Sequence, residues 1–203
     1  MIFLRYESFR EYVRMYPVTV VMLAINIAMA IVVAILPNRY EVPLFQFGAI
    51  TNAGDGPEWY MFITSMFLHS GFRHVLFNSF AIFVFAPPLE RMLGHFRYLL
   101  LYLLSGVIGN IVSEVLHTYV AHDVYASVGA SGAVYGIFGA YLYLILFRKE
   151  ILDYQSRQTV TIILVVGAIF SLLVSQINWY AHFGGLLGGL LLIGLFIKFG
   201  YNR

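Results

Sequence analysis

The chain has 203 residues, of which 61% are hydrophobic and 11% are charged, and its formal net charge is +2. This composition is far from that of a soluble domain and predicts an integral membrane protein. So small a charge gives no indication of a nucleic-acid partner. The absence of cysteine excludes disulfides, thiolate metal sites and thiol nucleophiles.

Six apolar stretches, each close to the roughly 20 residues that a membrane-spanning helix needs, occur along the chain. Turn-forming and charged residues, among them Pro87 and Pro88, are assigned to the connections. We expect one membrane domain, 17–199, between a short N-terminal segment, 1–16, and a tail, 200–203. The pattern predicts an all-α membrane protein with helices at residues 17–36, 67–86, 98–118, 131–147, 159–175 and 181–199.

The first stretch follows a basic segment, as the apolar region of a signal peptide would. Its apolar run is too long for a signal peptide, and no small-x-small cleavage site follows it. We therefore expect residues 17–36 to form a membrane anchor. The short basic N-terminus also lacks the character of a transit peptide, which favours a bacterial plasma membrane.

The basic residues predict how the helices are oriented, because Lys and Arg concentrate in cytoplasmic segments near helix ends. With both termini in the cytoplasm, ten of the twelve Lys and Arg residues lie on the cytoplasmic side, and Arg39 and Arg73 lie outside. We therefore expect cytoplasmic termini. The second, fourth and sixth helices then begin at the outer face, and the polar residues near their starts are His69, His74, Ser131 and His182.

Ser131 and His182 lie in apolar segments, where polar groups are costly to desolvate and indicate a functional site. A serine becomes nucleophilic beside a base, and histidine is the base suited to neutral pH. No Asp or Glu is near either residue in the sequence, so a dyad is the simpler hypothesis. Tyr135, one helical turn after Ser131, either packs against the imidazole or makes ordinary core contacts.

Acyl transfer also needs hydrogen-bond donors for the developing oxyanion. His74 and Asn78 are four residues apart and share one face of the second helix. The backbone amide of Ser131, at the start of a helix, is a third candidate donor. Asn78 could instead hydrogen-bond a neighbouring helix, but its closeness to His74 favours the oxyanion role.

Small residues at four-residue spacing let membrane helices approach closely. Gly132 and Gly136 form one such pair beside Ser131, and Gly185 and Gly189 form another after His182. A close crossing of these two helices would bring the serine and the imidazole together.

Four motifs, in this order along the chain, resemble those of the rhomboid intramembrane serine proteases. Residues 69–78 resemble the HxxxxHxxxN segment of the family's second helix, and residues 90–94 resemble the short ExxxG motif after it. Residues 129–132 resemble the nucleophile motif GxSG, and residues 181–189 resemble the motif AHxxGxxxG that carries the base. The resemblance extends from about residue 59 to residue 189.

The resemblance implies a six-helix rhomboid bundle and a serine endopeptidase that cleaves transmembrane protein substrates near the outer face. Ser131 would form an acyl-enzyme with His182 as base, and His74 and Asn78 would serve the oxyanion. No cofactor, metal or nucleic acid is implied, the partners are substrates and membrane lipid, and no oligomeric state is indicated. The supporting residues are Tyr135, His69, Gly129, Gly132, Gly185 and Gly189.

The chain resembles the minimal six-helix bacterial form of the family, which has no separate soluble domain. It departs from the family pattern in the loop between the first two helices, where Tyr60 follows Trp59 in place of a Trp-Arg pair. That difference leaves the anchoring of this loop open. His69 is expected to organise hydrogen bonds, because it lies off the helical face of His74.

Other functions are compatible with parts of the pattern. His69, His74, His182 and Glu114 all fall in the outer half, where they could line a metal or ion site, although no carboxylate stands at ligand spacing. A rhomboid-like protein that binds membrane helices without cleaving them would keep the same fold. A transporter would show inverted repeats, which are not evident. For Glu114 and Asn110 we expect structural hydrogen bonds to loops.

Overall fold

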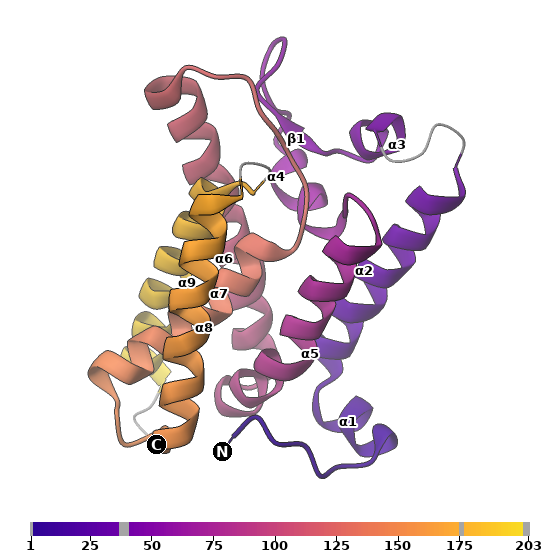
Figure 1. The fold of residues 1–203 in the computed structure, drawn as a ribbon. Helices are drawn as coiled ribbons and strands as arrows, with labels where there is room; N and C mark the ends of the chain where they lie inside the picture. Colours follow the sequence, from indigo (N-terminus) through magenta and orange to yellow (C-terminus); the bar gives the residue numbers. More distant parts are fainter. Residues whose placement is uncertain (1, 37–40, 175–176, 201–203) are drawn as a thin grey trace.

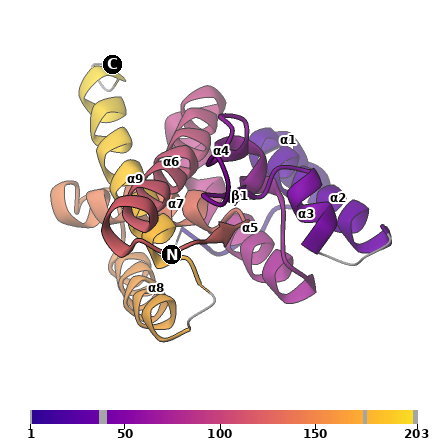
Figure 2. The same ribbon diagram turned by 90° about the horizontal axis from the view of Figure 1, so that it is seen from above.

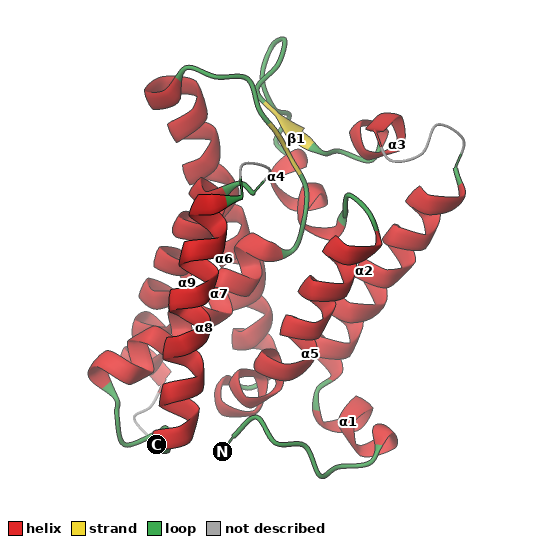
Figure 3. Cartoon of the chain, viewed as in Figure 1, coloured by secondary structure: helices red, strands yellow, loops and turns green. Residues whose placement is uncertain are grey.

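The computed structural model describes residues 2–36, 41–174 and 177–200. Helices make up most of these residues, as Figure 3 shows. The all-α prediction is confirmed. The long helices in Figure 1 are α2 (Pro17–Ile35), α5 (Phe72–Leu93), α6 (His95–Leu116), α7 (Ser131–Phe147), α8 (Tyr154–Leu173) and α9 (Trp179–Gly200).

Five helical stretches of the described residues, all except α7, are long and apolar enough to cross a membrane. The remaining long helix, α7, is apolar but has only 17 residues. The chain is therefore an integral membrane protein. Figure 1 shows α1 (Phe9–Met15) and the last turns of α9 at the same end of the bundle. This arrangement agrees with the prediction that both termini lie on one side of the membrane. Which membrane face that end meets remains a prediction.

The shortest helix of the bundle, α7, is also its central one. It contacts α5, α6, α8 and α9, whereas α2 lies farther out, at the edge of the molecule in Figure 2. More than half of its residues are buried. A short helix can be this deeply enclosed because a connecting loop reaches into the bundle before it, as Figure 1 shows.

Short elements that the sequence did not predict line the end of the bundle where α5 begins. They are α3 (Glu41–Gln46), α4 (Met61–Thr64), the 3₁₀ turn Ser65–Phe67, the π turn His117–Ala121 and two strands. The strands, β1 (Ile50–Thr51) and β2 (Ala126–Ser127), pair antiparallel with Ile50 opposite Ser127. This pairing anchors the loop that leads into α7.

The predicted end of the second helix at residue 86 is wrong, because α5 continues through Pro87 and Pro88. A proline inside a helix has no N–H for the carbonyl four residues earlier. In α5 the carbonyl of Phe83 accepts a hydrogen bond from the Tyr12 hydroxyl at 3.0 Å. The carbonyl of Val84 accepts one from the Arg5 guanidinium, also at 3.0 Å. The prolines are tolerated because residues from another segment replace the lost donors.

The predicted start of the same helix, at residue 67, is also wrong, since α5 begins at Phe72 after Gly71 with a φ of 103°. The fifth helix starts earlier than predicted, at Tyr154, because Asp153 caps it by accepting from the Ser156 amide at 3.0 Å. Its predicted last residue, Ser175, lies outside the described residues, as do residues 201–203 of the predicted tail.

Candidate active site

Ser131 is the first residue of α7. A backbone hydrogen bond holds the loop that precedes it. The amide of Gly129 donates to the carbonyl of Ser65 at 2.8 Å. Gly129 has a φ of 126°, which L residues rarely adopt. A Cβ at this position would also lie 2.6 Å from Nε2 of His74. Only glycine therefore lets the His74 ring lie against the turn that presents Ser131.

His182 lies in the first turn of α9, and α9 packs against α7 backbone to backbone. A Cβ on Gly185 would collide with the carbonyl of Gly132, and one on Gly189 would collide with the carbonyl of Gly136. Glycine thus allows the α7–α9 crossing that the sequence predicted. This contact joins the residue after Ser131 to the turn after His182. Within the described residues, no direct hydrogen bond links Ser131 to His182.

The imidazole of His182 is held from two sides. The ring of Tyr135 stacks on it with centroids 4.2 Å apart and an interplanar angle of 12°. Its Nδ1 lies 2.8 Å from the hydroxyl of Ser171, which is 2.9 Å from the Tyr135 hydroxyl. Sequence reasoning missed Ser171. The only signal was a serine in an apolar helix, four residues after Gly167.

His74 and Asn78 lie on α5 beside Gly129. Nδ1 of His74 lies 3.4 Å from the Ser70 amide and 3.1 Å from the Ser70 hydroxyl, and because the amide can only donate, these contacts favour the tautomer with the proton on Nε2. The Nε2–Cε1 edge of the His74 ring faces Gly129. The Asn78 side-chain amide donates to the His74 carbonyl at 3.0 Å and keeps a second hydrogen. Two N–H donors therefore lie near the turn before Ser131.

His69 is buried and edge-on to His74, with ring centroids 5.1 Å apart. Neither ring nitrogen makes a hydrogen bond of ordinary geometry to another described residue, and the predicted role of His69 in organising hydrogen bonds stays a prediction. Burial lowers the pKa of His69 to about 3, His74 lowers it further, and the carbonyl of Phe67 opposes the shift. The ring is therefore neutral near pH 7.

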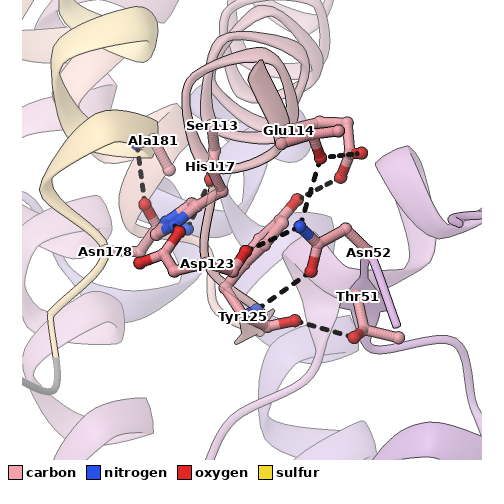
Figure 4. A network of polar contacts seen from close by, with 10 residues as sticks. Thr51, Asn52, Ser113, Glu114, His117, Asp123, Tyr125, Asn178 and Ala181 are labelled. Carbon is pink, nitrogen blue, oxygen red and sulfur yellow. Dashed lines mark hydrogen bonds and ion pairs between the residues drawn. The ribbon is translucent and has the colours of Figure 1, made fainter. Parts of the chain in front are cut away.

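A polar network beside the site holds the start of α9, as Figure 4 shows. The Asn178 side chain accepts from the Ala181 amide at 3.1 Å and donates to the Ser113 hydroxyl of α6 at 2.7 Å. The residue before His182 is thereby tied to α6. Next to this pair, the His117 ring stacks on Tyr125 at 4.2 Å.

The same network connects α6 to the loops. Glu114 accepts from the hydroxyls of Thr118 at 2.8 Å and Tyr125 at 2.9 Å (Figure 4). Asn110 donates to the carbonyl of Phe62 at 2.9 Å and to the hydroxyl of Ser65 at 3.0 Å. The predicted structural roles of Glu114 and Asn110 are confirmed. Ser65 is also the residue whose carbonyl holds Gly129, so this framework supports the loop before Ser131.

The metal-site hypothesis requires several ligands at one point. Across residues 2–36, 41–174 and 177–200, no three His, Cys, Asp or Glu side chains lie close enough together to hold a metal ion. The hypothesis therefore has no ligand set in this part of the chain.

Residues 56–199 match the family model described as "Rhomboid domain". The chain belongs to the rhomboid family. The match spans well over half of the sequence and includes all the candidate site residues. It also covers every long helix except α2.

Individual relatives agree with this assignment. This rhomboid is 42% identical over 200 residues to a Bacillus subtilis (strain 168) protein named "Putative rhomboid protease YdcA", a match that covers 97% of this chain and 96% of the relative. It is 36% identical over 148 residues to the rhomboid protease GluP of the same organism, covering 72% of this chain and 28% of GluP. It is also 35% identical over 137 residues to RHOMBOID-like protein 6, mitochondrial, of Arabidopsis thaliana, covering 66% of this chain and 42% of that protein.

Proposed function

We propose that this rhomboid is an intramembrane serine endopeptidase that cleaves transmembrane protein substrates. Family membership and the protease names of its relatives YdcA and GluP support the class of activity. One observation from the structure carries the assignment to residues. The His74 and Asn78 side chains lie beside Gly129, the turn after His182 packs against Gly132, and Tyr135 stacks on the His182 ring.

In the proposed reaction, Ser131 Oγ attacks the carbonyl carbon of a substrate peptide bond while Nε2 of His182 accepts its proton. The carbonyl oxygen becomes an oxyanion. Collapse of this intermediate breaks the C–N bond, and the same proton passes from His182 to the leaving amine. Water then hydrolyses the Ser131 ester by the reverse roles, which regenerates the hydroxyl and releases the new carboxylate.

Three donors are assigned to the oxyanion: Nε2–H of His74, the second amide hydrogen of Asn78 and the backbone N–H of Ser131. The tautomer of His74 supports its role, because Ser70 occupies Nδ1 and leaves the proton on Nε2. The start of α7 contributes the positive end of its helix dipole. Such donors stabilise the transition state most when they are fixed before the reaction.

The membrane placement is proposed from the charge distribution. Cytoplasmic termini put the starts of α5, α7 and α9 toward the outer face, where water can reach Ser131 and where a substrate helix would be cut. The high identity to a Bacillus subtilis relative supports a bacterial plasma membrane.

The proposal is tested by labelling the membrane-reconstituted protein with a fluorophosphonate probe, which reacts with activated serines. We expect the wild type to be labelled, and we expect no labelling of Ser131→Ala or His182→Ala. A metal chelator should have no effect. Phe80→Ala, an exposed position on α5, is the matched control and should be labelled like the wild type.

Labelling that persists in Ser131→Ala would overturn the serine mechanism. A well-folded wild type that is not labelled would instead support the alternative of a rhomboid that binds membrane helices without cleaving them. Thermal unfolding of each variant distinguishes lost reactivity from lost structure.

A further inference from the structure

Ser171 lies between the two aromatic side chains of the candidate site. It is 5% exposed, and its hydroxyl is 2.8 Å from Nδ1 of His182 and 2.9 Å from the hydroxyl of Tyr135. Tyr135 in turn stacks on His182. Three side chains from three helices, α7, α8 and α9, thus form a closed set of contacts, with Ser171 at Nδ1 and Tyr135 on the face of the imidazole.

The surroundings of Ser171 show that this contact is specific to the position. Only Ser156, Val160 and Ser171 are buried in α8, and the residues on either side of Ser171, Phe170 and Leu172, are exposed. Ser171 is therefore the one buried residue in the last three turns of this helix, all of which the structure describes. A buried hydroxyl requires hydrogen-bond partners, and its partners are both at the active site.

Gly167 makes room for the same contact. It lies one helical turn before Ser171, and a Cβ on it would be 2.7 Å from the Tyr135 hydroxyl. A side chain at this position would push the phenol away from α8. Gly167 and Ser171 thus form a recess in α8 into which the Tyr135 hydroxyl fits.

We propose that Ser171 is a positioning residue that holds His182 with its proton on Nδ1, so that Nε2 is the unprotonated base toward Ser131. This inference rests on the proposed function of Ser131 and His182. Nδ1–H donates to Ser171, and the Ser171 hydroxyl donates to Tyr135. The opposite sense, with Ser171 donating to Nδ1, would leave the proton on Nε2 and block its role as base.

Ser171 is the residue of α8 whose hydroxyl hydrogen-bonds His182, and α8 otherwise contributes few buried residues. The orientation of the base therefore depends on where α8 lies against α7. No carboxylate fills this position in the described chain, so a neutral hydroxyl takes the orienting role that an Asp has in a catalytic triad.

The test compares Ser171→Ala, Ser171→Thr and Tyr135→Phe in the reconstituted full chain, measuring the rate of fluorophosphonate labelling across a range of pH. We expect Ser171→Ala to slow labelling about tenfold, the rate equivalent of one neutral hydrogen bond. The acidic limb of the variant's pH–rate profile should move to lower pH, because the protonated His182 ring loses the hydroxyl that accepts its hydrogen bond. Ser171→Thr keeps the hydroxyl and should restore most of the rate.

Tyr135→Phe keeps the stack but removes the acceptor for the Ser171 proton, so it should slow labelling by a few fold. It also keeps the inference testable if Ser171→Ala does not fold. Ser156→Ala is the matched control, since it removes a buried hydroxyl from the other end of α8, where the partners are Asp153 and the amide of Ile2. It should be labelled at the wild-type rate and with the wild-type pH dependence.

An unchanged rate and pH dependence in both Ser171→Ala and Tyr135→Phe would overturn the role of Ser171, while loss of labelling in Ser131→Ala would leave the proposed function standing. If Ser156→Ala slows labelling as much as Ser171→Ala, the effect belongs to the packing of α8, and the positioning role is also overturned. If Ser131→Ala is labelled like the wild type, the proposed function fails, and the role of Ser171 fails with it.

Discussion

The two sides of the candidate site are built differently. On one side, α7 and α9 meet backbone to backbone at Gly132 and Gly185, and more than half of α7 is buried. On the other side, α8 reaches the site mainly through Ser171, and most of its residues are exposed. The nucleophile and the base are thus carried by closely packed helices, whereas the partner that orients the base comes from a helix held by few contacts. Stability and turnover should therefore respond differently to changes on the two sides.

The largest effect is expected from the oxyanion donors next to the packed side. His74→Ala and Asn78→Ala should each lower kcat on a reconstituted transmembrane substrate by about 10² to 10³, as removal of one preorganised donor does. The thermal unfolding midpoint should change little, because helices α7 and α9 are joined through backbone contacts that these side chains do not make. Leu76→Ala, an exposed position between them on α5, is the control. A loss of less than tenfold in both variants would contradict the oxyanion role.

A smaller but still large effect is expected from filling the α7–α9 contact. In Gly185→Ala the new methyl would meet the carbonyl of Gly132, so the helices must separate. Overpacking of this kind should lower the free energy of unfolding by about 3 kcal/mol. Ala168→Leu adds a larger group to the exposed face of α8 and should leave that free energy unchanged. Unfolding in a graded denaturing detergent measures both. Equal effects of the two variants would remove the distinction between the two sides.

The smallest effect is expected at the capped start of α8. Hydrogen bonds from Ser156 lower the pKa of Asp153 to about 2. A lowered pKa means that the carboxylate stabilises the fold above its unfolded pKa of about 4, and that this contribution is lost as the pH falls toward 2. Asp153→Ala should therefore lower the thermal midpoint at pH 7, with a difference from the wild type that shrinks on acidification. Asp153→Asn keeps a cap without a charge, and its midpoint should not show this titration. A difference between Asp153→Ala and the wild type that does not change with pH would contradict the assignment.

Local sequence signals were sufficient for some helix ends and insufficient for others. The bounds of α7 were predicted correctly, because a glycine-rich turn precedes its apolar run and charged residues follow it. The end of α5 was predicted wrongly, because the rule that proline ends a helix holds only when nothing replaces the lost donor. Tyr12 and Arg5 supply the hydrogen bonds, and both lie about 70 to 80 residues earlier in the chain. The start of α8 could have been placed from Asp153 alone.

By itself, the sequence determined the membrane class, the presence of six long helices and the small group of polar residues that could react. These follow from composition, from apolar length and from spacing along single helices, which are local properties. Only the tertiary structure decided that Tyr135 stacks on His182, that Ser171 bonds the imidazole and that His69 lies edge-on to His74. The physical reason is that a hydrogen bond or a ring stack depends on which helix faces which, and α7, α8 and α9 are brought together by packing that no single segment encodes.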